Sequence, residues 1–230
     1  MSKHLTRDLE DLHRKVMGMA ARVEEAIYAA LKALQNRDSH LARDVVAGDE
    51  TIDTLENAIY EECLRLIALH QPVAVDLRQI ATTFMVTTDL ERMGDLAVDI
   101  AERAEALSSL PPVLGEAATD LLSAKLQRMT DIATGMVRQS LDSFVGMDAS
   151  MARRVIRTDI EVDRYHAEII RDVIVRMQAK PEAVEPGLSL FSAVRHLERI
   201  ADHATNIAED VIYLVDGEVV RHRPDAVAAE

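Results

Sequence analysis

Two stretches, DLERMGDLAVDIAE at residues 89–102 and HLERIADHATNIAE at residues 196–209, share one pattern of acidic and apolar residues at an offset of 107. Both have apolar residues at the three- and four-residue spacing of a helix that is buried along one side. Upstream of each stretch, an offset of 110 aligns a further set of identical residues. This set pairs Lys15, Met19, Leu31, Asp38, Ala42, Arg43, Asp49 and Asp53 with Lys125, Met129, Leu141, Asp148, Ala152, Arg153, Asp159 and Asp163. The chain is therefore predicted to be a duplication.

Clusters of Gly and Pro and two polar turns divide the chain into six segments of roughly 28–36 residues with helical apolar spacing. The polar turns are QNRDSH at 35–40 and VGMDAS at 145–150, and each offers Asp or Ser to cap the next helix. We expect an all-α fold of six long helices, arranged as two tandem three-helix bundles. The predicted repeats cover residues 1–110 and 111–217, and residues 218–230 are expected to form a disordered tail.

Composition limits the kinds of partner. The 230 residues carry a formal net charge of −14, which argues against DNA or RNA because phosphate binding needs a basic face. Aromatic residues make up 3% of the chain and Trp is absent, so aliphatic residues and Met must fill the core, as in packed helices. No signal peptide is visible and no apolar run approaches the ~18 residues of a membrane span. We expect a cytoplasmic protein, peripheral to the membrane at most.

The two quoted stretches carry acidic stripes. At about 100° per residue, Glu91, Asp95 and Asp99 lie within about 80° of one another and opposite the apolar side of their helix. The second stretch repeats the stripe with Glu198, Asp202 and Asn206. The preceding helix of each repeat adds an acid pair at i,i+4, which is Asp49 and Asp53 in the first repeat and Asp159 and Asp163 in the second.

Such a stripe is either a solvated acidic face or a cation site. Stacked like charges destabilise a helix by about 0.2–0.5 kcal/mol per pair, and this arrangement recurs in both repeats, which favours bound cations. Oxygen donors suit Mg, Mn, Ca or Fe, and Zn can enter adventitiously. Because several carboxylates crowd each stripe, more than one ion per repeat is expected. His203 and His166 are the neighbouring nitrogen donors, and His166 matches Glu56 of the first repeat.

Other candidate residues give weaker signals. Glu10 and His13 match the Glu-x-x-His pattern of di-iron bundles, but that site needs two copies, so an exposed first turn is expected. His196 falls at the core edge and is expected to be a packed histidine. Cys63 lies on an apolar helix side, which predicts a buried, inert thiol. Arg92 and its counterpart Arg199 form either flank salt bridges or a docking contact.

With LHQPVAVDLRQI at residues 69–80, the doubled Leu-Glu-Arg signature resembles the PhoU family over nearly the whole chain. The resemblance implies two similar three-helix bundles that bind multinuclear metal clusters, with Fe, Mn, Mg or Zn as candidate ions. Carried over by position, the implied ligands are Asp49, Asp53, Glu91, Asp95, Asp99, Asp159, Asp163, Glu198, Asp202 and Asn206. Asn206 stands where the first repeat has Asp99, so the second site is expected to hold its ion more weakly or to hold fewer ions.

The resemblance also implies a role without catalysis. It is that of a regulator of phosphate uptake and phosphate-starvation signalling, which contacts the ATPase of a phosphate-specific ABC transporter and a sensor histidine kinase at the inner membrane face. Homodimers or larger oligomers are implied as well. The alternative is a carboxylate-bridged metal enzyme, an oxidase or hydrolase on a helical bundle. The absence of nucleophile or phosphate-loop motifs disfavours this alternative.

Overall fold

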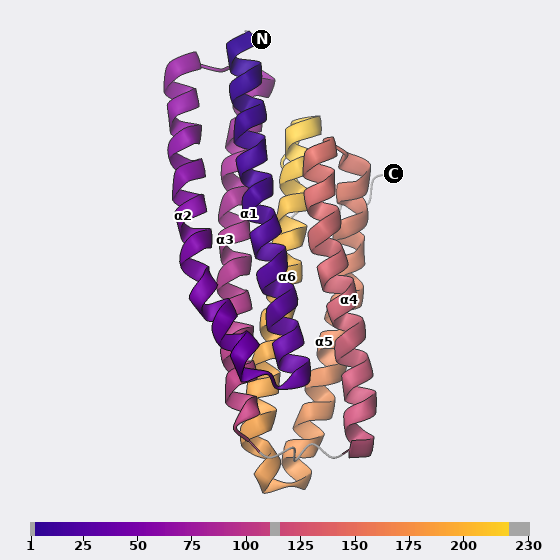
Figure 1. Cartoon of the computed structure of the whole chain (residues 1–230). Helices are drawn as coiled ribbons and strands as arrows, with labels where there is room; N and C mark the ends of the chain where they lie inside the picture. Colours follow the sequence, from indigo (N-terminus) through magenta and orange to yellow (C-terminus); the bar gives the residue numbers. More distant parts are fainter. Residues whose placement is uncertain (1–2, 111–115, 221–230) are drawn as a thin grey trace.

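Six long helices, each of 31–35 residues, make up the computed structural model, which describes residues 3–110 and 116–220 (Figure 1). They are α1 (Lys3–Asn36), α2 (Ser39–His70), α3 (Ala74–Ser108), α4 (Glu116–Gly146), α5 (Ala149–Ala179) and α6 (Val184–Asp216), with a short 3₁₀ turn, η1 (Pro181–Ala183), before α6. Neither described range contains a strand. The predicted all-α fold is confirmed.

In each repeat, one aspartate caps the N-terminus of the second helix. Asp38 accepts hydrogen bonds from the amides of His40 and Leu41, both at 3.0 Å, and Asp148 accepts one from Met151 at 2.9 Å. The residue before each cap is in the left-handed region, with φ of 54° at Arg37 and 49° at Met147. Equivalent turns with equivalent caps confirm both predicted turns and their Asp caps.

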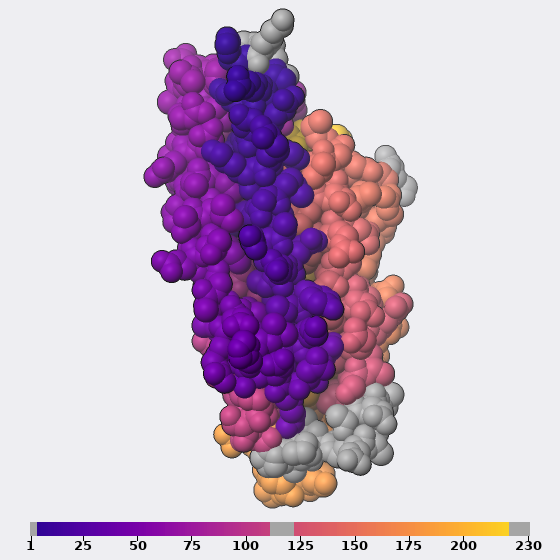
Figure 2. All heavy atoms as spheres, viewed as in Figure 1, coloured from indigo at the N-terminus to yellow at the C-terminus, as the bar shows by residue number. Residues whose placement is uncertain are grey.

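The helices form two three-helix bundles that lie side by side. The first contains α1, α2 and α3, and the second contains α4, α5 and α6. The helices α3 and α6 run antiparallel and pack against each other at the centre, while α2 packs on α3 and α5 packs on α6 (Figure 1). On the opposite side α1 lies beside α4, as the surface in Figure 2 shows. One broad face is therefore built from α2, α3, α6 and α5 in that order.

Small residues line the two central helices. Ala97, Ala101 and Ala104 on α3 are fully buried, and so are Ala201 and Ala204 on α6. Short side chains let helix backbones approach closely, while larger residues such as Met93 and Met129 fill the space within each bundle. The core needs almost no aromatic residues, as the composition predicts.

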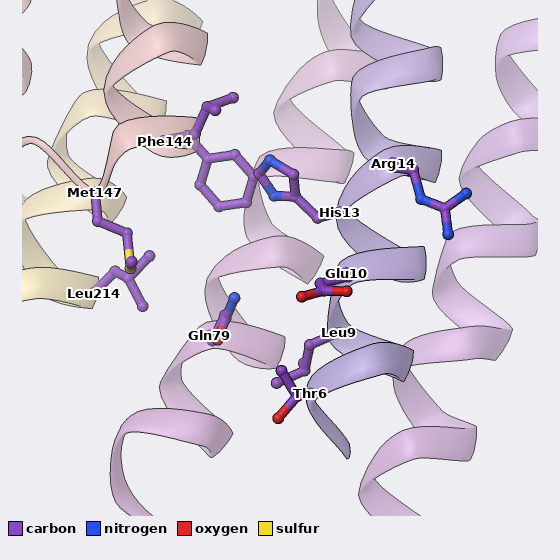
Figure 3. A pocket seen from close by; sticks show the side chains of 10 residues that line it. Thr6, Leu9, Glu10, His13, Arg14, Gln79, Phe144, Met147 and Leu214 are labelled. Carbon is purple, nitrogen blue, oxygen red and sulfur yellow. The ribbon is translucent and has the colours of Figure 1, made fainter. Parts of the chain in front are cut away.

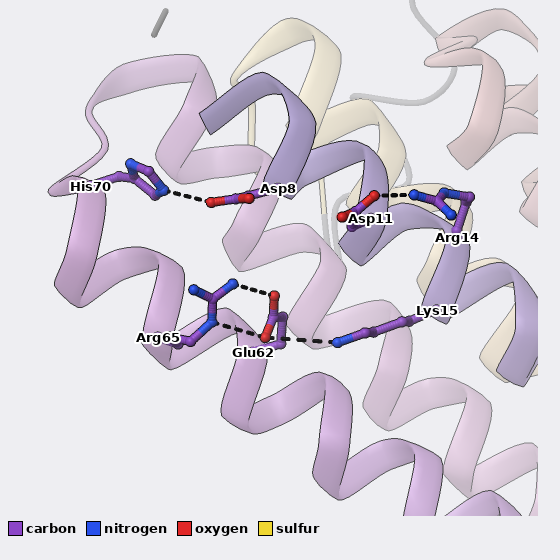
Figure 4. A network of polar contacts seen from close by, with 7 residues as sticks. All are labelled: Asp8, Asp11, Arg14, Lys15, Glu62, Arg65 and His70. Carbon is purple, nitrogen blue, oxygen red and sulfur yellow. Dashed lines mark hydrogen bonds and ion pairs between the residues drawn. The ribbon is translucent and has the colours of Figure 1, made fainter. Parts of the chain in front are cut away.

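Polar contacts join α1 to α2 away from the core (Figure 4). His70 Nε2 lies 2.9 Å from Asp8 Oδ2, and Glu62 accepts from Arg65 at 2.6 Å and pairs with Lys15 at 3.7 Å. Asp11 and Arg14 form a further pair within α1. In the second bundle the counterpart of Lys15 is Lys125, whose Nζ pairs with Asp172 at 2.7 Å and Glu168 at 3.4 Å. A lysine on the first helix thus binds acids of the second helix in both repeats.

The expected repeat boundary at residue 110 falls between α3 and α4. There Arg37 Nη1 donates to the carbonyl oxygen of Leu110 at 3.0 Å, so the end of the first repeat is held against its own α1–α2 turn. After α6 the chain leaves the helix at Gly217, whose φ is 76°, and Val220 is buried. Most of the predicted tail, residues 221–230, lies outside the described residues.

Candidate functional site

The carboxylates of α2 and α3 gather in the groove between these helices. Asp49, Asp53 and Glu56 lie on the α2 stripe nearest α3, opposite Glu91 and Asp95. Burial raises the pKa of Asp49, and the charges of Asp53 and Asp95 raise it further. The pKa of Glu91 is raised by burial and then by Asp95, with smaller effects of Glu56 and Asp53. Acids from two helices therefore form one interacting group, which we call the first carboxylate cluster.

The second carboxylate cluster occupies the equivalent groove between α5 and α6. Its members are Asp159, Asp163, Glu198, Asp202 and Glu209. Burial, followed by the charges of the other four acids, raises the pKa of Asp159 to about 7. Burial and the charges of Glu198 and Asp163 raise the pKa of Asp202 to about 6. Burial and like-charge repulsion together therefore raise carboxyl pKa values further here than in the first repeat.

An arginine lies beside each cluster. Arg92 pairs with Asp95 at 3.2 Å and with Glu91 at 3.4 Å, so it partly neutralises the first cluster and opposes the rise in the pKa of Glu91. Its counterpart Arg199 is exposed and lowers the pKa of Asp202. For Arg92 the flank salt bridge is observed, and a docking role for either arginine stays a prediction.

Asp99 and Asn206 do not join the clusters. Asp99 Oδ2 lies 3.5 Å from His196 Nδ1, and Asn206 Nδ2 donates to Asp89 Oδ1 at 3.1 Å. His203 Nδ1 lies 2.8 Å from the same Asp89 oxygen. Because each i+4 step turns by about 40°, the third member of a stripe points about 80° away from the first, here toward the neighbouring central helix. The structure thus places eight of the ten predicted ligands, all except Asp99 and Asn206, in the two clusters.

These contacts reveal an internal two-fold relation between the repeats. At the offset of 107, Asp89 corresponds to His196, and Asn206 corresponds to Asp99. The Asp89–Asn206 and His196–Asp99 contacts are therefore equivalent, and they lie on opposite sides of the α3–α6 crossing. Asp89 is buried, and sequence analysis missed it as an interaction site. The signal was the exchange of Asp for His at the first position of the two quoted stretches.

Three further predictions can be compared with the structure. Cys63 is fully buried, and burial raises the pKa of its thiol to about 11, which confirms an inert cysteine. His196 is a half-buried, packed residue that also contacts Ser192 at 3.0 Å, as expected. The expected exposed turn holds for Glu10 but is wrong for His13, which is half-buried because its ring stacks on Phe144 at a centroid distance of 5.5 Å. With Glu10, it lines a pocket of about 570 Å³ where α1 meets the α4–α5 turn (Figure 3).

The donor chemistry suits a hard cation, but the side chains are not gathered around one point. As they stand, no three His, Cys, Asp or Glu residues in the described ranges are grouped closely enough to hold a metal ion. The clusters supply carboxylate oxygens from two facing helices, which is the ligand type that Mg, Mn and Fe accept. In the second groove His166 adds a nitrogen, because its Nε2 is buried without a hydrogen-bond partner among the described residues. Rotation of side chains about their χ angles would be needed to complete a coordination shell.

A duplicated three-helix unit, joined through its third helices and bearing one carboxylate cluster per unit, defines the class: a tandem helical-repeat protein without strands in its described ranges. The family model described as the PhoU domain matches twice, over residues 16–104 and 126–211. The chain belongs to the PhoU family.

Relatives match over almost the full length. The chain is 40% identical over 219 residues to the phosphate-specific transport system accessory protein PhoU homolog of Aquifex aeolicus, covering 95% of this chain and 96% of the relative. It is 38% identical to the protein of that name from Pseudomonas putida, covering 96% and 84%. The crystal structure of PhoU from Pseudomonas aeruginosa superposes with a TM-score of 0.85 at 37% identity, covering 93% of this chain and 99% of that one. The phosphate transport system regulatory protein PhoU from Streptococcus pneumoniae has the same TM-score at 30% identity, covering 94% and 99%.

Proposed function

We propose that this chain is a non-enzymatic, metal-binding regulator of phosphate uptake and of phosphate-starvation signalling. The main support is its similarity over nearly the whole chain to accessory and regulatory proteins of phosphate transport. Within the described residues, no helix combines the length and the apolar character needed to cross a bilayer. We assign the transport step itself to another protein, because the relatives are named as accessory or regulatory proteins of phosphate transport.

The observation that carries the metal part of the proposal is the pair of carboxylate clusters. In the first groove, Asp49, Asp53, Glu91 and Asp95 would hold the cations. In the second groove the holders would be Asp159, Asp163, Glu198 and Asp202. A bound divalent or trivalent ion supplies positive charge that offsets the repulsion between these acids. In each groove the acidic side chains come from two facing helices. A bound cation would therefore fix α2 relative to α3 in the first repeat and α5 relative to α6 in the second.

The proposed partners are the ATPase component of a phosphate-specific ABC transporter and a phosphate-sensing histidine kinase, met at the inner face of the cell membrane. The chain would work as a homodimer or larger oligomer. Its net charge of −14 disfavours direct binding to anionic lipid, so protein contacts would hold it there.

Two measurements test the proposal. The first is elemental analysis of protein purified without chelator or affinity metal, comparing the chain with a variant carrying Asp159→Asn and Asp202→Asn and with an exposed α4 control, Asp142→Asn. We expect bound metal in the chain and in the control, and a reduced content in the double variant. Equal metal content in all three, or none in any of them, would contradict the metal assignment.

The second measurement is phosphate uptake in cells that lack their own accessory protein. Expression of this chain should restrain uptake and repress a phosphate-starvation reporter when phosphate is plentiful. Uptake and reporter signals that are indifferent to the chain would refute the regulatory role.

The carboxylate-bridged metal enzyme remains the second candidate, because Asp49 lines a cavity of about 420 Å³ together with Gly48 and Gly94. An oxidase or hydrolase needs an enclosed metal with an open position for substrate. Oxygen consumption or ester hydrolysis by metal-loaded protein, lost in Asp49→Asn, would favour the enzyme over the regulator.

A further inference from the structure

An apolar strip continues each groove beyond its carboxylate cluster, toward the α2–α3 turn in the first repeat. On α2, Tyr60, Leu64 and Ile67 are 44%, 53% and 38% exposed, and on α3 Leu77 is 41% exposed. Between them lies the half-buried ring of Phe84, with its centroid 4.2 Å from that of Tyr60. These residues form one surface, which we call the first apolar strip.

The second repeat has the same strip at the equivalent positions. At the offset of 110, the counterparts of Tyr60, Leu64 and Ile67 are Ile170, Ile174 and Met177. At the offset of 107, the counterparts of Leu77, Ala81 and Phe84 are Val184, Leu188 and Phe191. Ile174, Val184 and Leu188 are 40%, 41% and 58% exposed. We call this set the second apolar strip.

Packing within each bundle explains only part of each strip. Phe84, Ile170, Met177 and Phe191 pack partly against the core, whereas Leu64, Leu77, Ile174 and Leu188 are 40–58% exposed. A side chain that is about half exposed does not need to be apolar, yet the exposed apolar residues of the first strip have apolar counterparts in the second. On the side of α2 away from the groove, Glu61 and Arg65 are polar and exposed, and Leu69 is the exposed apolar residue nearest to them. Grouped apolar residues on a water-facing surface mark a contact site.

Charge indicates what fits the grooves. At 1.5 Å per residue, the part of α2 from residue 60 to 67 is about 10 Å long, which is two turns of a helix. The middle of the acidic part, residues 49–56, lies about 16 Å further along the same groove. An amphipathic helix laid along the groove would place two or three apolar anchors in the strip and basic residues about eleven positions away over the carboxylates.

We propose that each of the two grooves, α2–α3 and α5–α6, binds an amphipathic helix of a partner protein, with apolar side chains on the strip and Lys or Arg against the carboxylate cluster. This inference rests on the proposed function in that the chain acts through protein contacts, and it names the chemistry of the partner. The basic side chains would take the place of bound cations, so the partner helix and metal would compete for each carboxylate cluster. A second copy of the chain fits poorly, because it would bring its own acidic clusters against the first. An anionic membrane is repelled by the same charge.

Isothermal titration calorimetry in chelator, with a synthetic helix of about 20 residues, tests the inference. The peptide carries Leu at helical spacing in its first two turns and Lys in the remainder, and a matched peptide carries Glu in place of Lys. We expect one Lys peptide per groove, weaker binding at high salt, and at least about tenfold weaker binding of the Glu peptide.

Variants separate the two grooves. Leu64→Ser with Leu77→Ser should remove one bound peptide per chain, and adding Ile174→Ser with Leu188→Ser should remove the other. Tyr28→Ser changes an α1 residue that is 66% exposed and should leave the stoichiometry unchanged. Because all the substituted residues are exposed, circular dichroism should show the same helix content in every variant.

Several outcomes would overturn the inference. These are no binding of the Lys peptide, equal binding of the Glu peptide, or equal loss in Tyr28→Ser. Self-association that disappears in the Leu64 and Leu77 variant would assign the strip to a second copy, and binding of the chain to anionic phosphatidylglycerol vesicles through the strip would assign it to lipid.

The same variants distinguish this inference from the proposed function in cells. If the chain restrains phosphate uptake and the variant with all four substitutions restrains it equally, the groove inference fails and the function stands. If the Lys peptide binds as expected but the chain never affects uptake, the groove stands and the proposed function fails.

Discussion

Replacing Asp159 with Asn should stabilise the protein when metal is absent. Burial and the charges of the neighbouring acids raise the pKa of Asp159 from 3.8 to about 7. The folded state therefore binds a proton more tightly than the unfolded state does. Its stability falls as the pH rises from about 4 to about 7, because folding must then overcome the cost of an ionised Asp159. Asn keeps the shape of the side chain and cannot ionise.

The size of the effect follows from the shift. Three pKa units correspond to about 4 kcal/mol as an upper bound. Asp159 is only partly buried and shares its repulsion with Asp163 and Asp202, so solvent screening and coupling reduce the expected gain to about 1–2 kcal/mol near pH 8. Near pH 5 the gain should fall to less than half of that, because the wild-type carboxyl is then protonated in the folded state.

Urea unfolding followed by far-ultraviolet circular dichroism measures this gain, since the chain has no Trp for fluorescence. The experiment is run with chelator near pH 5 and pH 8. Added Mn²⁺ should stabilise the wild type more than Asp159→Asn. The difference in the free energy of unfolding between the two proteins should then shrink or change sign.

Two matched substitutions calibrate the result. Asp142→Asn removes an exposed carboxylate from α4 and should leave stability unchanged at both pH values. Asp49→Asn makes the equivalent change in the first repeat, where the pKa is raised less, and should give a smaller gain. If Asp159→Asn lowers stability near pH 8, or gives the same gain at both pH values, then burial and the neighbouring acids do not destabilise the ionised form of Asp159 and the reasoning is refuted.

Three further substitutions and one labelling experiment have defined outcomes. Asp89→Ala removes a buried carboxylate and leaves its two α6 partners unpaired, so calorimetry should show a loss of about 2–4 kcal/mol. In Gly187→Ala the new Cβ would lie 2.6 Å from Met177 Cγ, which predicts a loss of about 1–3 kcal/mol in urea unfolding. Gly135→Ala, also in a helix, meets no atom closer than 4.0 Å and should instead gain about 0.5–1 kcal/mol. Cys63 should resist iodoacetamide near pH 8 until denaturant is added, as mass spectrometry would show; rapid labelling of the folded chain would contradict its burial.

The fold could be predicted from local signals that need no knowledge of tertiary contacts. Apolar spacing gave the six helices, and Asp38 and Asp148 act as the caps that the two polar turns offered. The offsets of 107 and 110 gave the duplication, since identical residues at turn positions imply identical turns. None of these signals predicts that α3 packs against α6, because that contact depends on which buried helix faces meet in the folded chain.

At the candidate site, too, tertiary contacts could not be predicted from local sequence signals. Angles on an isolated helix placed Asp99 with Glu91 and Asp95, but the antiparallel α6 lies beside that edge and supplies His196 as a partner. His13 gave no sign of packing, because its contact, Phe144, lies far away in sequence. The grouping of acids from two helices came from the family resemblance, and the structure explains it physically by placing the α2 and α3 stripes across one groove.

The exchange of Asp89 and His196 at equivalent positions bears on how this molecule arose. A single ancestral repeat would form a symmetric homodimer through its third helix. With present-day side chains, two first repeats would set Asp89 against Asp99, carboxylate facing carboxylate, whereas a first and a second repeat set it against Asn206 and His203. When expressed as separate polypeptides, the first and second repeats should therefore associate with each other in preference to forming homodimers. Covalent fusion allowed each copy to evolve side chains that complement those of the other.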